Sequence, residues 1–372
     1  MRLAGEYIVR HSQPNGQFVY WINTNPDVTM AEAYNMVRHA GAMYSLAGYH
    51  QLHPTKQSLR VLEHANSFLK SQVKELTDVP HTLAVWSDGN INHSQEPLSA
   101  KLGGTGLGLA AMSELEKILP GLTPKLQLEG LGNFLLFMQR DDGGFYSTYY
   151  PIFPGRDDSW TSLYYPGEAA LGLLLLNDVL PNKEWVRGAR EALLFLARER
   201  QGQDQIPADH WALIATEKLL SDASFTTEED RVLLRTHAKQ VVRLILSERS
   251  TQQDNLNLDG CFTSDGRTTP TATRLEGLIA ASRVISNQDA IHPEMKDSIQ
   301  RGIQFLMRSQ IKVGAHAGGI PRAIARLPEG DPSWSQNFNL RATEIRIDYV
   351  QHALSAFMGY RRVLGETAGA AK

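Results

Sequence analysis

The sequence predicts an all-helical fold, an (α/α)6 toroid in which six inner helices form a ring inside six outer helices. Three observations predict it: a pattern that recurs at helix ends, an alternation between two kinds of helix, and connections whose length depends on their direction. The chain has 372 residues, of which 42% are hydrophobic and 21% charged, as is ordinary for a globular protein with a large core. Because the repeat runs the whole length, we expect one domain spanning residues 1–372.

The recurring pattern is an aromatic residue followed by leucine or isoleucine, then a polar residue and a glycine at fixed offsets. In the clearest copy, Phe134 is followed by Gln139 and Gly143. Copies with the same offsets begin at Tyr7 and Phe305, and weaker ones begin at Phe68 and Phe195. The Phe305 copy places its glycine at Gly314. Because the Tyr7 copy stands at the N-terminus, residues 2–12 are predicted to be an outer helix whose inner partner lies elsewhere in the chain.

Helices of a second kind lie between these copies and are rich in small and apolar residues on all sides. They are predicted over residues 30–50, 103–117, 165–177, 207–220, 273–286 and 342–363. The amphipathic helices include 2–12, 58–73, 124–140, 184–200 and 228–248. A helix that is apolar all round must be buried on all sides, so the second kind forms the inner ring and the amphipathic kind covers it. The last inner helix has no outer partner after it, so the outer helix 2–12 is predicted to close the ring.

The connections support this arrangement independently. Links from an inner to an outer helix are about six or seven residues long, as at 118–123 and 178–183. Links from an outer to an inner helix are mostly long: 13–29, 74–102, 141–164, 249–272 and 311–341, with 201–206 as the short exception. In a ring of hairpins, all links of one direction emerge on one face. Because long loops in a compact domain are usually functional, we expect the working surface on the face that carries them.

The alternation resembles the six-hairpin toroids of carbohydrate-active enzymes, namely glucuronyl epimerases, N-acylglucosamine 2-epimerases and unsaturated-uronide hydrolases. This resemblance covers the whole chain and implies a hydrolase, epimerase or lyase that acts on a glycan or a sugar-derived small molecule in a central cleft. The helix-end pattern is also similar to the QW repeats of triterpene cyclases. However, the Asp-x-Asp-Asp acid of those cyclases is absent, and Asp141-Asp142 and Asp157-Asp158 do not extend to a diphosphate site.

Composition excludes several other classes of function. A net charge of −3 and a pI near 6.5 leave no basic face for a nucleic acid, and no apolar run is long enough to span a membrane. The single cysteine, Cys261, excludes internal disulfides and cysteine-rich metal sites. The N-terminus lacks a signal-peptide pattern, so we expect a cytoplasmic protein. No nucleotide, metal or hydrolase motif occurs, and no cofactor is predicted.

The candidate acid/base residues are Glu168 and Asp209, assisted by Tyr165 and His210. Both carboxylates stand near the start of a predicted inner helix, at similar depth, where they can project into one pocket. Carboxylates in such a pocket can have raised pKa values and exchange protons with a substrate. The alternative is structural, because an acid in the first turn of a helix is favoured by the helix dipole.

The candidate substrate-binding residues combine charged and aromatic side chains at the same level of the ring. They are Arg274, Glu276, Arg346, Asp348, Tyr149, Trp160 and Trp211. An arginine suits a carboxylate or phosphate of the substrate, since it bonds such a group in a bidentate manner. Because residues two apart on a helix do not face each other, Arg346 and Asp348 are expected to pair with other helices or with a ligand.

These observations lead to the hypothesis of a carbohydrate-active enzyme that acts on an acidic or modified sugar by carboxylate acid/base chemistry. Two alternatives stay open: a cyclase or prenyl-type enzyme with an apolar cavity, and a non-catalytic toroid that binds a glycan or a protein. What lines the central cavity separates the three. The sequence does not specify the substrate, the reaction type or the oligomeric state.

Overall fold

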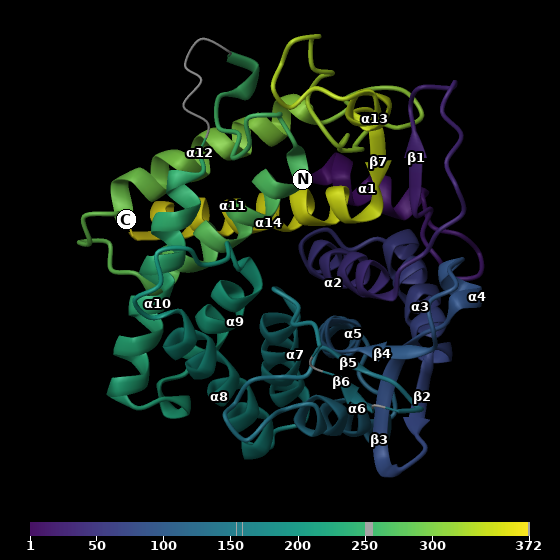
Figure 1. The fold of residues 1–372 in the computed structure, drawn as a ribbon, viewed down its shortest axis with the longest axis vertical. Helices are drawn as coiled ribbons and strands as arrows, with labels where there is room; N and C mark the ends of the chain where they lie inside the picture. Colours follow the sequence, from purple (N-terminus) through teal and green to yellow (C-terminus); the bar gives the residue numbers. More distant parts are fainter. Residues whose placement is uncertain (154, 158, 250–255, 371–372) are drawn as a thin grey trace.

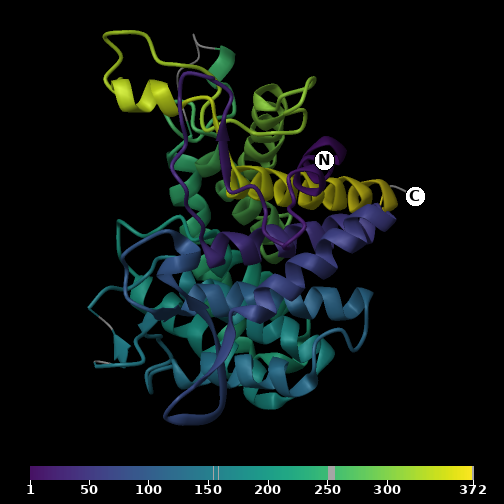
Figure 2. The same cartoon turned by 90° about the vertical axis from the view of Figure 1, so that its right-hand side faces the viewer.

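A computed structural model describes residues 1–153, 155–157, 159–249 and 256–370. Helices account for 58% of the structure, in agreement with the all-helical prediction. Figures 1 and 2 show the elements following one another around the molecule, with the N-terminal helix beside the C-terminal one. Among the described helices, none combines the length and the apolarity that crossing a bilayer needs.

Six helices of the described chain form the inner ring. They are α2 (Met36–Leu52), α5 (Leu102–Ile118), α7 (Tyr165–Val179), α9 (His210–Leu220), α11 (Thr268–Val284) and α14 (Ile347–Ala370). Each contacts the next in this order, and α14 contacts α2, so the ring is closed. This confirms the predicted fold, although α2 begins six residues later than expected, because Asn35 caps it by accepting a hydrogen bond from the backbone N–H of Arg38.

Six outer helices cover the ring. They are α1 (Arg2–Arg10), α3 (Lys56–Ser71), α6 (Lys125–Phe137), α8 (Lys183–Arg200), α10 (Glu228–Ser247) and α12 (His292–Ser309). The helix α1 packs against α14, α2 and α3, and its residues Tyr7, Ile8 and Val9 are buried. The N-terminal helix therefore closes the outer ring as predicted.

The remaining elements lie in the long connections, except for one 3-10 turn between α9 and α10. A five-stranded antiparallel sheet has the order β2 (Val73–Leu76), β3 (Val79–Ser87), β4 (Ser99–Lys101), β5 (Thr148–Tyr149) and β6 (Arg156–Asp157). A separate pair joins β1 (Trp21–Asn23) to β7 (Glu344–Arg346), with Trp21 opposite Arg346. Short helices are α4 (Gly89–Asn92), α13 (Gln336–Arg341) and the 3-10 turns Ala223–Phe225 and Leu256–Leu258. In Figure 2, α13 and its flanking loops stand out from the body of the toroid.

Glycines in four of the long connections fit these connections against the next outer helix. Gly16, Gly143, Gly260 and Gly318 all have positive φ, and a side chain on any of them would strike the backbone of the following outer helix. For Gly318 that backbone belongs to Leu3, so the last repeat packs on α1. Gly314, the glycine at the offset of the recurring pattern, has open space around it, and the glycine that packs on the next helix is Gly318, four residues later.

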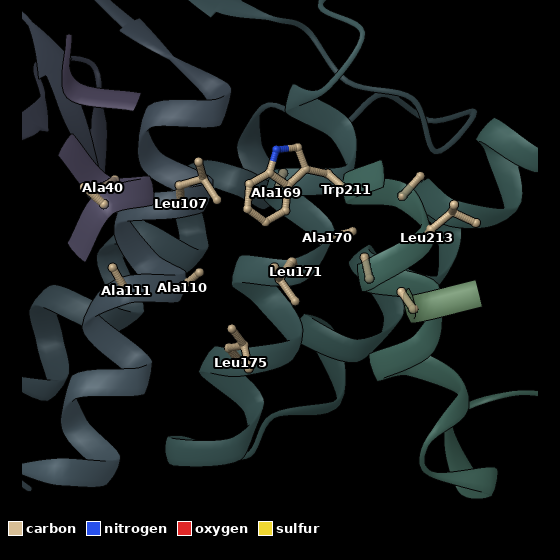
Figure 3. Close-up of a cluster of buried hydrophobic side chains, with 14 of the residues drawn as sticks. Ala40, Leu107, Ala110, Ala111, Ala169, Ala170, Leu171, Leu175, Trp211 and Leu213 are labelled. Atoms are coloured by element: carbon tan, nitrogen blue, oxygen red, sulfur yellow. The ribbon is translucent and has the colours of Figure 1, made fainter. Parts of the chain in front are cut away.

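Small residues bring the inner helices close together. A side chain at Gly106 would strike the backbone of Glu168 and Ala169, and one at Gly172 would strike Gly106. The glycine-rich start of α5 thus lets α7 lie directly against it. Figure 3 shows the small and branched side chains, among them Ala110 and Leu171, that fill the space between neighbouring inner helices.

Candidate active site

A cavity of about 470 Å³ opens at the face where the long loops emerge, at the N-terminal ends of the inner helices. All six inner helices contribute to its wall, and the rest comes from the residues just before α2, α7 and α11 and from the connection between α12 and α14. Its lining residues are Asn35, Val37, Arg38, Leu107, Tyr164, Tyr165, Glu168, His210, Trp211, Arg267, Thr269, Pro270, Thr273, Arg274, Arg322, Arg341, Arg346, Asp348, Tyr349, Gln351 and His352. The lining is rich in charge, whereas a cyclase-type cavity would be lined mainly by aromatic side chains.

Glu168 lies in the first turn of α7 and is 4% exposed. Pro166 stands in the first turn of the helix, where proline is favoured, and the absence of a side chain at Gly103 on α5 makes room for the carboxyl group. Its buried Oε2 has no hydrogen-bond partner. Burial and, to a smaller extent, the negative charge of Asp209 raise the pKa of Glu168 to about 8. At neutral pH, Glu168 is therefore mostly protonated and can donate a proton.

His352 and Glu276 form a hydrogen-bonded pair between α14 and α11. The Nδ1 atom of His352 lies 2.7 Å from Oε2 of Glu276. His352 lines the cavity, whereas Glu276 lies behind it and lines a second cavity that opens between the C-terminal halves of the inner helices. When Nδ1 donates to the carboxylate, Nε2 of the neutral ring is left as a proton acceptor.

His210 completes this cluster. Its Nε2 lies 3.9 Å from the same Glu276 oxygen, and both of its ring nitrogens are buried without a hydrogen-bond partner. Burial, then the neighbouring His352 and Arg274, lower the pKa of His210, which keeps its ring neutral. Within the described chain, His210, Glu276 and His352 are the residues whose ligand atoms, all within 4.8 Å of one another, could hold a metal ion. Two imidazoles and a carboxylate suit a divalent transition metal.

Asp209 does not reach the cavity, which corrects the expectation that it shares a pocket with Glu168. It is fully buried, accepts a hydrogen bond from the backbone N–H of Ala212 at 3.0 Å and pairs with Arg200 at 2.8 Å. It is thus the N-cap of α9 and a partner for a buried cation. This pairing holds the first turn of α9 in place, where His210 and Trp211 face the cavity.

The predicted aromatic residues separate into three groups. Tyr165 and Trp211 line the cavity. Trp160 is exposed on the loop above it and meets the ring of Tyr165 edge-on at 5.7 Å between ring centres. Tyr149 is buried in the sheet between Trp86 and Phe137, away from the cavity, which corrects its assignment to substrate binding.

The predicted arginines are already paired with carboxylates. Arg274 donates to Glu248 at 2.6 Å, on the neighbouring α10 side of the ring. Arg346 forms two hydrogen bonds with Asp348, at 2.6 and 2.9 Å, so the expectation that these two would not pair is wrong. Arg346 is in strand β7 and not in the helix, so the helical spacing rule does not apply. Although burial opposes it, Arg346 and Arg38 hold the pKa of Asp348 below its ordinary value.

Sequence reasoning left several cavity residues out of the predicted site. His352 lies four residues after Asp348, and whether it faces the cavity depends on the rotation of α14 about its axis, which the sequence does not give. Tyr164 meets the ring of His210 edge-on at 5.1 Å between ring centres. Arg322 and Thr269 come from a loop and from a helix start that lies five residues before the predicted one. Pro270 is the sequence signal for this earlier start, because proline is favoured in the first turn of a helix.

Comparison with known protein families found no match, and neither did comparison with curated protein sequences. Comparison with solved structures found the same fold. A cellobiose 2-epimerase from Spirochaeta thermophila has a TM-score of 0.65 at 14% identity, covering 99% of this chain and 95% of its own. An α-1,6-mannanase from Salegentibacter sp. HEL1_6 has a TM-score of 0.64 at 11% identity, covering 96% and 97%. An unsaturated glucuronyl hydrolase specific for heparin has a TM-score of 0.64 at 12% identity, covering 98% and 96%.

The match extends over nearly the full length of each chain, so it concerns the whole ring and not a single hairpin. At these identities it concerns the fold. The chain therefore has the (α/α)6 toroid fold that these carbohydrate-processing proteins share.

Proposed function

We propose that this chain is an enzyme that transfers protons to and from an acidic or modified sugar bound in the loop-face cavity. The observation that carries the proposal is that two complementary groups line the same cavity. Glu168 is buried, protonated and unpartnered, so it is a proton donor. His352, whose Nδ1 is hydrogen-bonded to Glu276, presents Nε2 as a proton acceptor.

The pairing of the other carboxylates favours proton abstraction over hydrolysis. Hydrolysis of a glycosidic bond usually employs two free carboxyl groups. In this cavity Asp348 is paired with Arg346 and Arg38, and Glu276, which lies behind the cavity wall, is paired with His352. Glu168 therefore lacks a second free carboxylate among the cavity-lining residues, and its available counterpart is an imidazole.

The reaction that suits an acid and an imidazole is proton transfer next to a carbonyl group. His352 removes the hydrogen from the carbon beside the carbonyl of an open-chain sugar. The electron pair of the broken C–H bond shifts toward the carbonyl oxygen, which accepts the proton of Glu168. When the enediol turns its opposite face toward His352, the protonated His352 returns a proton to that carbon while the enediol O–H gives its proton back to Glu168, so both residues regain their starting states and the sugar is epimerised. That a cellobiose 2-epimerase and a glucuronyl hydrolase have this fold agrees with a sugar as substrate.

The test is incubation of the protein in D2O with a panel of aldoses, disaccharides and uronates, followed by mass spectrometry. We expect deuterium at the carbon beside the carbonyl and no shortened sugar. His352→Gln is expected to abolish exchange, and His53→Gln, at the opposite end of α2, is expected to preserve it. Shortened sugar without deuterium would instead indicate hydrolysis. Binding of a sugar with neither change would indicate a non-catalytic toroid.

A further inference from the structure

We propose that Arg322 and Thr269 form an anion-binding subsite that holds a carboxylate, sulfate or phosphate substituent of the sugar. This inference rests on the proposed function and gives it a substrate class and an anchor. It replaces Arg274 and Arg346 as the residues that recognise the anionic group.

The other arginines around the cavity are already paired with carboxylates. Six arginine side chains line it, and five of them are paired with carboxylates in the part of the chain that the structure describes. These five are Arg38, Arg267, Arg274, Arg341 and Arg346. Only four carboxylates serve them, since Asp348 pairs with both Arg346 and Arg38. The wall therefore carries more positive than negative charge.

The sixth, Arg322, has no carboxylate within ion-pair distance among the described residues. Its backbone is fixed, because its N–H donates to the carbonyl of Glu344 and its carbonyl accepts from the N–H of Thr268. Its guanidinium lies over the ring of Phe338 at 5.3 Å from the ring centre. Its Nη1 is buried without a hydrogen-bond partner. A buried N–H group of a cation without a hydrogen-bond partner raises the free energy of the folded protein. A ligand atom that accepts a hydrogen bond from Nη1 would therefore bind favourably here.

Thr269 supplies a second unsatisfied donor on the same wall. Its Oγ1 is also buried without a hydrogen-bond partner, and the residue lines the cavity. The bond between Thr268 and the carbonyl of Arg322 brings the start of α11 and the Arg322 loop together. The Thr269 side chain begins one residue further along that helix. A hydroxyl and a guanidinium N–H together suit an oxyanion, which accepts several hydrogen bonds at once.

The surroundings favour an anion over a neutral hydroxyl group. Burial and the positive charges of Arg341 and Arg267 lower the pKa of Arg322, so an added negative charge relieves repulsion among these arginines. The guanidinium is planar and its fork matches two oxygens of a carboxylate, sulfate or phosphate. Glu168 stands on α7, in another part of the wall, and remains available for proton transfer at the sugar ring.

The first test uses inorganic sulfate and phosphate as probes, and so does not depend on any enzymatic activity. Thermal unfolding is followed at increasing concentration of each anion, with chloride at matched ionic strength as reference. We expect both anions to raise the melting temperature of the unmodified protein. Arg322→Gln should lose this response. Arg326→Gln, which removes the same charge from an exposed position of the same loop, should retain it.

The second test measures binding of glucuronate, glucose 6-sulfate, glucose 6-phosphate and glucose by calorimetry. We expect the anionic sugars to bind the unmodified protein more tightly than glucose. Arg322→Gln should weaken their binding about 10- to 100-fold, as for loss of a charged hydrogen bond, and leave glucose unchanged. Thr269→Val should weaken it less. Arg322→Lys, which keeps the charge without the fork, should rank between the unmodified protein and Arg322→Gln.

The outcomes separate this inference from the proposed function. If glucose and the anionic sugars bind equally, or if Arg322→Gln keeps the preference, the subsite is refuted while the proposed function stands. If sulfate and phosphate stabilise the protein through Arg322 but no sugar is processed, the subsite stands and the proposed function fails. Equal melting temperatures of the two glutamine variants without anion would establish that loss of binding is not loss of folding.

Discussion

Two buried carboxyl groups, Glu168 and Asp209, show how one partner decides the role of a residue. Both stand near the start of an inner helix, and the sequence alone did not separate them. Asp209 forms an ion pair with Arg200. In the copy of the pattern that begins at Phe195, Arg200 stands at the same offset as Gln139 in the copy that begins at Phe134. This replacement of an amide by a cation was the available signal that a buried anion lay nearby. Glu168 has no such cation, so its charge is not stabilised.

Substitution of Glu168 by glutamine tests its role as a proton donor. Glu168→Gln keeps the size of the side chain and removes the proton that it would donate, so turnover should fall about 10²- to 10⁴-fold. Folding should be preserved, because the side chain is mostly neutral already. Activity of the unmodified protein should decline as the pH rises through about 8, the pKa of Glu168. Steady-state rates on a substrate found in the sugar panel provide the measurement.

The stability of the same variant gives an independent check. The pKa of Glu168 is raised from 4.5 to about 8 on folding, so the unfolded chain releases this proton first as the pH rises. Stability of the unmodified protein should therefore decrease between about pH 4.5 and 8, and Glu168→Gln should lack this component. Urea unfolding at several pH values measures both. A variant that is destabilised yet fully active would contradict the catalytic role.

Asp209 is predicted to be structural. Asp209→Asn retains a good helix cap but removes the charge that faces the buried Arg200. Breaking one partner of a buried pair costs about 3–5 kcal/mol of unfolding free energy. As a control, Asp222→Asn changes an equivalent cap on an exposed turn and should cost little. An unchanged unfolding free energy for Asp209→Asn would show that Arg200 finds another partner.

At the scale of helices and loops, the sequence predicted which elements exist better than where they begin. The alternation was readable because inner helices are apolar on all sides, a property that does not depend on exact bounds. The residue at which each helix begins was harder to predict, since caps and short strands determine it. Residues 344–346, which the sequence predicts to be part of the last inner helix, form strand β7. This places Arg346 where it can pair with Asp348. The rotation of each inner helix, which selects His352 for the cavity, depends on packing across the whole ring.

The glycines of the last connection offer a matched pair for testing the repeat. Gly314 and Gly318 both have positive φ, but only Gly318 packs against the backbone of α1. Gly314→Ala should cost about 1–2 kcal/mol for the left-handed conformation alone. Gly318→Ala should cost that amount plus about 1–3 kcal/mol for the forced separation from α1. Chemical denaturation measures the difference, and equal costs would mean that the loop does not fix α1.

At the scale of the whole molecule, the toroid depends on joining its two ends. Ten of the twelve ring helices in the described part of the chain form five consecutive hairpins, and the sixth pair joins the outer helix α1 to the inner helix α14, at the far end of the chain. The sequence predicted this because the number of inner and outer helices matched only when residues 2–12 were counted. What it did not predict is that the connection carrying Arg322 also rests on α1, through Gly318.

Truncation of a single side chain tests this closure. Ile8 is fully buried in α1, so Ile8→Ala should lower the unfolding free energy by about 2–5 kcal/mol, as in the interior of other domains. Arg2→Ala, on the exposed side of the same helix, removes only a surface ion pair with Glu6 and should cost less than about 1 kcal/mol. Because α1 supports the Gly318 connection, Ile8→Ala should also weaken sulfate binding at Arg322. Thermal unfolding with and without sulfate measures both effects. An Ile8→Ala protein as stable as Arg2→Ala would show that the ring closes without α1.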